Sequence, residues 1–129
     1  MPVKANDLDN FEAALKKLLE FKAIYDGTDI HRAGIIQAFE FTFEQCWKAL
    51  QKKAGKEGLT LASPRKALEW AMTNGWISPN QENIWLTMLS DRNLTTHTYR
   101  DVTAEAVATR VLKNYVTQLQ ELLMKLKKA

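Results

Sequence analysis

One polar segment of the sequence, residues 91–101, carries the side chains best suited to chemistry. It holds Arg92, His97 and Tyr99 between two apolar stretches. Histidine takes up or gives up a proton near neutral pH, and arginine presents a permanently charged planar fork that fits a phosphate group. One residue of each kind can cleave an RNA phosphodiester without a metal, because the histidine can act on the 2′-hydroxyl or the leaving oxygen while the arginine stabilises the developing charge.

The spacing of Arg92 and His97 restricts how they act together. Residues five positions apart on a straight helix point about 140° apart, so these two do not share a face. Joint action needs a bend between them, or two copies of the chain that meet at an interface. Thr95 and Thr96 favour a bend or a helix end, because β-branched side chains weaken helices.

The same residues also fit a purely structural role. Arg92 could pair with a nearby carboxylate such as Asp91 or Asp101, and His97 would then be an ordinary loop histidine. An arginine and a histidine at this spacing occur by chance in many proteins. The residues alone therefore leave both roles open.

Other polar and aromatic residues are weaker candidates. Glu40 and Glu44 are four positions apart and can share a helix face. Paired carboxylates can bind a metal or transfer protons, but they are more often simply solvated, and we expect no metal site. Trp85 precedes Arg92 by about two helical turns, so we expect this tryptophan to lie near the motif.

Apolar residues repeat at steps of three and four along most of the chain, which is typical of amphipathic helices. The pattern predicts five helices, over residues 7–25, 29–54, about 64–74, about 79–92 and from Thr103 onward. Asn6 or Asp7 is the expected N-cap of the first helix, Asp29 that of the second and Ser63, before a proline, that of the third. No strand pattern competes, so we predict an all-α fold, an antiparallel helical bundle.

Two helices are apolar over more than one face. On the second, Phe41 and Cys46 lie beside the main apolar stripe, which predicts that this helix is covered on more than one side. The last helix carries a second stripe formed by Leu112, Val116 and Leu123. That stripe needs either two neighbouring helices or one neighbour and a second subunit.

The composition is that of a globular protein, with 46% hydrophobic and 26% charged residues among 129. We expect one domain, residues 1–129, and a cytoplasmic location, because there is a single cysteine, no apolar run of about 20 residues and no signal-peptide pattern. The formal net charge of +3 permits nucleic-acid binding without demanding it. Much of the excess lies in two lysine-rich helix ends, where it also complements the helix dipole.

The run from Arg92 to Tyr99, Arg-Asn-Leu-Thr-Thr-His-Thr-Tyr, resembles the Arg-x4-His-x-Tyr motif of HEPN domains. The resemblance is nearest to the branch described as nucleotidyltransferase substrate-binding proteins, and it covers nearly the whole chain. It also includes Trp47-Lys48 at the end of a Phe-rich helix, Ser63-Pro64-Arg65, and the approach Trp85…Met88-Leu89 to the motif.

The resemblance implies a helical bundle that dimerises with the two motifs facing each other. Many such proteins are metal-independent ribonucleases that act as toxins, without a cofactor, beside a small nucleotidyltransferase partner. By that likeness His97 would be the general base or acid, Arg92 would bind the scissile phosphate and Asn93 would support it. Tyr99 would line the cleft or accept AMP from the partner, whereas Asp91 receives no role.

Three functional hypotheses follow from these features. The first is a ribonuclease toxin of a toxin–antitoxin pair, with a composite site at a homodimer interface and RNA as substrate. The alternative is a non-catalytic substrate-binding or docking subunit of a two-component nucleotidyltransferase. Its partner would carry the Gly-Ser and paired-aspartate motif that this chain lacks. The third is a helical homodimer whose polar turn is only structural.

Overall fold

The computed structural model describes residues 7–95 and 101–129, with only the backbone at 95, 101 and 102. All of its regular elements are helical: α1 (Asp9–Ile24), α2 (Asp29–Lys56), α3 (Pro64–Thr73), η1 (Pro79–Gln81), α4 (Glu82–Thr95), α5 (Asp101–Arg110), η2 (Val111–Tyr115) and α6 (Val116–Lys128). Here η1 is a 3₁₀ turn and η2 a π-helical turn. Because α5, η2 and α6 follow without a break, they form one rod. The predicted all-α bundle of five helical segments is confirmed.

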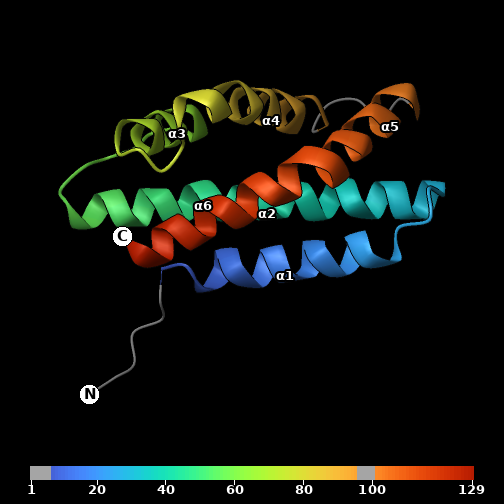
Figure 1. Ribbon diagram of the computed structural model, residues 1–129, viewed down its shortest axis with the longest axis horizontal. Coiled ribbons are helices and arrows are strands. Elements are labelled where there is room, and N and C mark those ends of the chain that lie inside the picture. The colour runs from blue at the N-terminus through green and yellow to red at the C-terminus, as the bar shows by residue number, and fades with distance from the viewer. Residues whose placement is uncertain (1–6, 96–100) are drawn as a thin grey trace, which may run out of the picture.

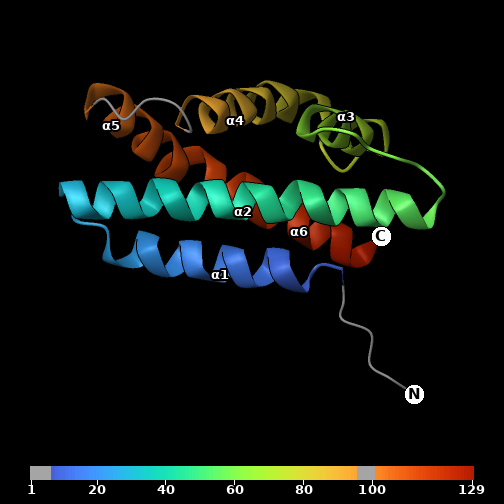
Figure 2. The same cartoon turned by 180° about the vertical axis from the view of Figure 1, so that it is seen from behind.

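The long helix α2 is the centre of the bundle. It lies between α1 on one side and α3 with α4 on the other, and the α5–η2–α6 rod crosses these helices diagonally (Figure 1). The view from behind shows α2 with no other helix of the described chain in front of it (Figure 2). One long side of α2 therefore faces solvent, while its remaining sides are covered by neighbours.

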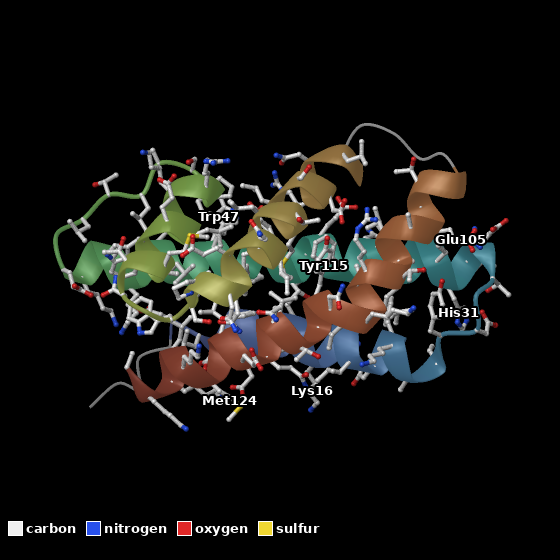
Figure 3. All side chains as sticks on the ribbon, turned by 45° about the horizontal axis from the view of Figure 1, so that its top comes forward. Lys16, His31, Trp47, Glu105, Tyr115 and Met124 are labelled. Atoms are coloured by element: carbon white, nitrogen blue, oxygen red, sulfur yellow. The ribbon has the colours of Figure 1, made fainter. Side chains whose placement is uncertain are left out.

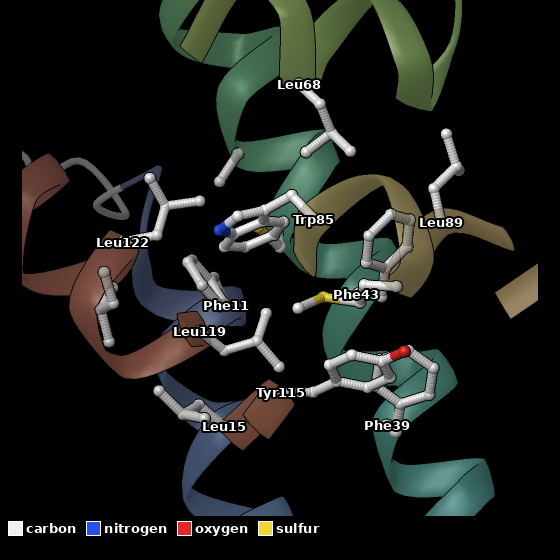
Figure 4. Packing of buried hydrophobic residues seen from close by; sticks show 14 of the residues in the cluster. Phe11, Leu15, Phe39, Phe43, Leu68, Trp85, Leu89, Tyr115, Leu119 and Leu122 are labelled. Atoms are coloured by element: carbon white, nitrogen blue, oxygen red, sulfur yellow. The ribbon is translucent and has the colours of Figure 1, made fainter. Parts of the chain in front are cut away.

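The core forms where α1, α2, α4 and the rod meet. Large side chains from all four elements are fully buried there, among them Phe11, Phe39, Phe43, Trp85 and Tyr115 (Figure 4). The rings of Phe39 and Tyr115 stack with centroids 5.2 Å apart. Trp85 packs inside this core. Most of the motif lies outside the described residues, so its nearness to Trp85 stays a prediction.

Local capping explains both ends of α3. Ser63 accepts a hydrogen bond from the Lys66 amide at 3.2 Å, with proline as the next residue, as predicted. At the other end of α3, Gly75 adopts a φ of 77°, and the amide of Trp76 donates to the Ala71 carbonyl at 3.0 Å. This is a Schellman ending, in which a glycine takes the left-handed position.

The first two helix starts differ from the prediction. Thr28, rather than Asp29, caps α2 and accepts a hydrogen bond from the His31 amide at 3.4 Å. Asp29 is already the first helical residue. At α1 the N-cap position is Leu8, whose side chain has no acceptor, and Asp7 instead pairs with Lys56 at 2.7 Å. Asn6 lies outside the described residues.

The chain itself covers the second apolar stripe of the last helix. Val116 and Leu123 are buried, and Leu112 packs partly buried against the core. A second subunit is thus not needed to bury this stripe. On α2, Cys46 is fully buried as expected, whereas Phe41 is 56% exposed and lies outside the core. None of the described helices is both long enough and apolar enough to span a bilayer.

Candidate functional site

The motif arginine is held by an ion pair across the bundle. Arg92, in the last turn of α4, donates from Nη2 to Oε2 of Glu44 on α2 at 2.8 Å. Its Nη1 also donates to the side chain of Asn93 at 3.3 Å. Arg92 therefore has a carboxylate partner, as the structural alternative expected. The partner is Glu44, not Asp91, and the side chain of Asp101 is not described.

Glu44 is the centre of a small network rather than a solvated surface carboxylate. The indole Nε1 of Trp47 donates to the same oxygen, Oε2, at 3.0 Å. The Lys48 ammonium lies 3.7 Å from Oε1. Partial burial by itself would raise the pKa of Glu44, but the hydrogen bond from Trp47 and the charge and hydrogen bond of Arg92 together lower it. The carboxylate therefore stays ionised at neutral pH.

These residues gather where the end of α4 meets α2. We define the α2–α4 surface as Phe41, Glu44, Lys48 and Arg92. Residues three and four apart are neighbours on a helix, so Phe41, Glu44 and Lys48 line one side of α2. The surface thus combines an exposed aromatic ring, an exposed lysine and a neutralised arginine–glutamate pair.

A second polar cluster lies on the inner side of the same helix end. We define the Asp91 cluster as Asp91, Arg110 and Tyr115. The Asp91 side chain is only 7% exposed and accepts two hydrogen bonds from Arg110, from Nε to Oδ2 at 2.7 Å and from Nη2 to Oδ1 at 2.8 Å. The Tyr115 hydroxyl donates a third bond to Oδ2. Figure 3 shows Tyr115 in the middle of the molecule, between α4 and the rod.

The π-helical turn η2 makes this cluster possible. Arg110 immediately precedes it and Tyr115 is its last residue. Residues five apart diverge on an α-helix, but in a π-helix the hydrogen bonds run from i to i+5, so such residues stack about one turn apart. Nothing in the sequence indicates this cluster, and the family resemblance gives Asp91 no role. Periodicity gives no signal for a single π turn.

The pKa values of both partners of Asp91 are raised. The hydrogen bonds and charge of Asp91 raise the pKa of Arg110. Burial raises the pKa of Tyr115, and its hydrogen bond to the Asp91 carboxylate raises it further. The arginine is therefore charged and the tyrosine neutral at any physiological pH. Beside the cluster, Arg110 and Tyr115 line a pocket of about 160 Å³ together with Asn83, Ile84, Thr87 and Asn114.

Two of the predicted site residues, His97 and Tyr99, lie outside the described residues. Asn93 is exposed and accepts the hydrogen bond from Arg92. Within the described part of the chain, no group of three or more histidine, cysteine, aspartate or glutamate side chains is arranged to hold a metal ion. The candidate site in the described part of the chain thus consists of the α2–α4 surface and the Asp91 cluster.

Comparison with known families settles the relationship of the chain. A family model described as nucleotidyltransferase substrate binding protein like matches residues 6–128. The chain belongs to this family. The crystal structure of a protein from Thermus thermophilus is 38% identical, covers 90% of this chain and 98% of its own, and has a TM-score of 0.80. No curated protein matches the chain. The predicted resemblance to the nucleotidyltransferase substrate-binding branch is therefore confirmed.

Proposed function

We propose that the chain is the non-catalytic substrate-binding or docking subunit of a two-component nucleotidyltransferase. The α2–α4 surface is the part that contacts the enzyme subunit. The observation that carries this proposal is the ion pair between Arg92 and Glu44 beside the exposed ring of Phe41. The name of the family, which refers to nucleotidyltransferases, supports the same reading.

The ion pair weakens the case for Arg92 as a phosphate ligand. A phosphate group bound to the other N–H donors of Arg92 would lie close to the ionised Glu44 carboxylate, which already accepts a hydrogen bond from Nη2. Like charges at such distances repel strongly in a partly buried site. Because Glu44 neutralises the charge of Arg92, the exposed part of this arginine is better suited to contact a protein.

The residue types of the α2–α4 surface fit a protein partner. Aromatic and arginine side chains are enriched among the residues that dominate binding energy at interfaces. Phe41 offers an apolar contact, while Lys48 and the ion pair offer polar contacts around it. Flanking charges of this kind fix orientation and register more than affinity.

The proposal is tested by titrating the chain against the nucleotidyltransferase that is its candidate partner. Truncating a dominant interface aromatic costs about 2 kcal/mol or more, so Phe41→Ala should weaken binding about 30-fold. Met124→Ala is the matched control, because Met124 is 58% exposed, much as Phe41 is 56% exposed, but lies on α6. Equal affinities for both variants and the wild type would refute the docking surface.

The ribonuclease is the second candidate, favoured by the spacing of Arg92, His97 and Tyr99. It needs a homodimer that completes the site, with RNA as substrate and AMP addition to Tyr99 as the control by the partner. RNA cleavage by the chain alone, with EDTA present, separates the candidates. Cleavage by the wild type and none by an equally folded His97→Ala variant favours the ribonuclease. Mass spectrometry of the Tyr99 peptide, after incubation with the nucleotidyltransferase and ATP, tests the modification.

A further inference from the structure

We infer that Asp91, Arg110 and Tyr115 are positioning residues for Arg92, so that the buried Asp91 cluster sets the geometry of the α2–α4 surface. The inference rests on the proposed function for its binding consequence. The structural consequence, that the Asp91 cluster controls the geometry of the Arg92–Glu44 pair, follows from the observed contacts alone.

The two ion pairs of α4 involve adjacent residues. Asp91 and Arg92 are consecutive, and consecutive helical residues point about 100° apart. Asp91 is bound by Arg110 and Tyr115 of the rod, and Arg92 is bound by Glu44 of α2. The last turns of α4 are therefore tied in two directions at once. A rotation of this helix end cannot relax one tie without straining the other.

The Asp91 cluster is an unfavourable way to stabilise the fold if stability is its only role. Removing charges from water carries a large penalty, and apolar residues of similar volume often stabilise a core as well or better. The π turn is itself a rare conformation that is found frequently at functional sites. A bidentate arginine–carboxylate pair instead provides fixed geometry. Fixed geometry is what a neighbouring interface residue needs.

Weakening the Asp91 cluster should change the position of Arg92 on the α2–α4 surface. Tyr115→Phe keeps the ring and its packing on Phe39 but removes one of the three bonds that hold Asp91. Without the hydrogen bond from Tyr115 to Asp91, the end of α4 can rotate slightly, and Arg92 then loses its fixed position against Glu44. Trp47 reports this change directly, because its indole donates to the same Glu44 oxygen that Arg92 binds.

The experiment compares Tyr115→Phe with Thr42→Val. Both changes remove one buried hydroxyl from a side chain of nearly unchanged shape, but Thr42 bonds to the Ala14 carbonyl at 3.1 Å, on the α1 side of α2. In ¹H–¹⁵N spectra of the free chain, Tyr115→Phe should shift the Trp47 indole resonance, and Thr42→Val should leave it in place. An unmoved Trp47 resonance in Tyr115→Phe overturns the inference, whatever the chain binds.

Affinity for the nucleotidyltransferase supplies the second readout. One hydrogen bond contributes about 0.5–1.5 kcal/mol, so Tyr115→Phe should weaken binding about twofold to twelvefold. In an Arg92→Ala background the same substitution should have no further effect, because the cluster acts through Arg92. Additive losses would show that Tyr115 acts otherwise, and would overturn the inference while the docking proposal stands. If Arg92→Ala and Phe41→Ala both leave affinity unchanged, the docking proposal fails, and the Trp47 resonance alone decides the inference.

Discussion

Replacing Asp91 with asparagine is the most direct perturbation of the buried cluster. The two side chains have nearly the same shape, so the packing around position 91 stays intact. The change replaces one accepting oxygen with an NH₂ donor. At the place of Oδ1 this donor would face the Nη2–H of Arg110, and at the place of Oδ2 it would face both the Nε–H of Arg110 and the Tyr115 hydroxyl. It also leaves the guanidinium of Arg110 without its counter-charge.

The magnitude follows from the burial of the two partners. Breaking a fully buried ion pair by removing one partner costs about 3–5 kcal/mol. The Arg110 side chain is 36% exposed, so water can partly solvate the orphaned cation. We therefore expect the lower end, about 3 kcal/mol of unfolding free energy. For a chain of this length that corresponds to a decrease in Tm of about 10 °C.

The assay is thermal and denaturant unfolding followed by circular dichroism, with Asp29→Asn as the matched control. Asp29 also pairs with an arginine at 2.8 Å, but its side chain is 89% exposed. Exposed pairs contribute about 1 kcal/mol or less, so this variant should unfold close to the wild type. Equal losses of unfolding free energy at positions 91 and 29 would refute the claim that burial makes the Asp91–Arg110 pair more stabilising than an exposed pair.

Two further predictions concern pH. The pKa of Tyr115 is raised on folding, so its contribution to stability is complete below its ordinary value of 10.0 and is lost as the pH rises toward the folded value. The difference in unfolding free energy between wild type and Tyr115→Phe should therefore shrink above pH 10, and the late phenolate absorbance should be missing from the variant. The pKa of Glu44 is lowered on folding, so its contribution is present above its ordinary value of 4.5 and is lost as the pH falls through the folded value. Denaturant titrations should show a stability difference between wild type and Glu44→Gln at pH 7 that disappears in acid; a difference that grows in acid would contradict the assigned network.

The sequence predicts those parts of the fold that depend on local signals. Ser63 before a proline and Gly75 after Asn74 mark the ends of α3, because capping and left-handed glycines act within a few residues. Thr28 and Asp29 are both good capping residues one position apart, and the prediction of Asp29 as the cap was wrong by one residue. The helical periodicity predicts the number and extent of the helices without showing which of them pack together.

The candidate site depends on contacts that periodicity cannot show. Glu44 and Arg92 are 48 residues apart, and their pairing follows from how α4 lies on α2. The same arrangement turns Trp85 into the core and leaves Trp47 as the tryptophan of the site. The Asp91 cluster depends on a single π turn, which changes the facing of Arg110 and Tyr115 without any change in composition.

The measurement that tests the central claim most directly is the indole ¹H–¹⁵N spectrum of the chain during titration with the proposed nucleotidyltransferase partner. Trp47 is tied to the α2–α4 surface through Glu44, whereas Trp70 and Trp76 pack edge to face at the α3 end of the bundle. Docking through this surface predicts that the Trp47 resonance shifts or broadens first, and that Trp70 and Trp76 stay in place. Binding that moves Trp70 and Trp76 while Trp47 stays unchanged would contradict the account.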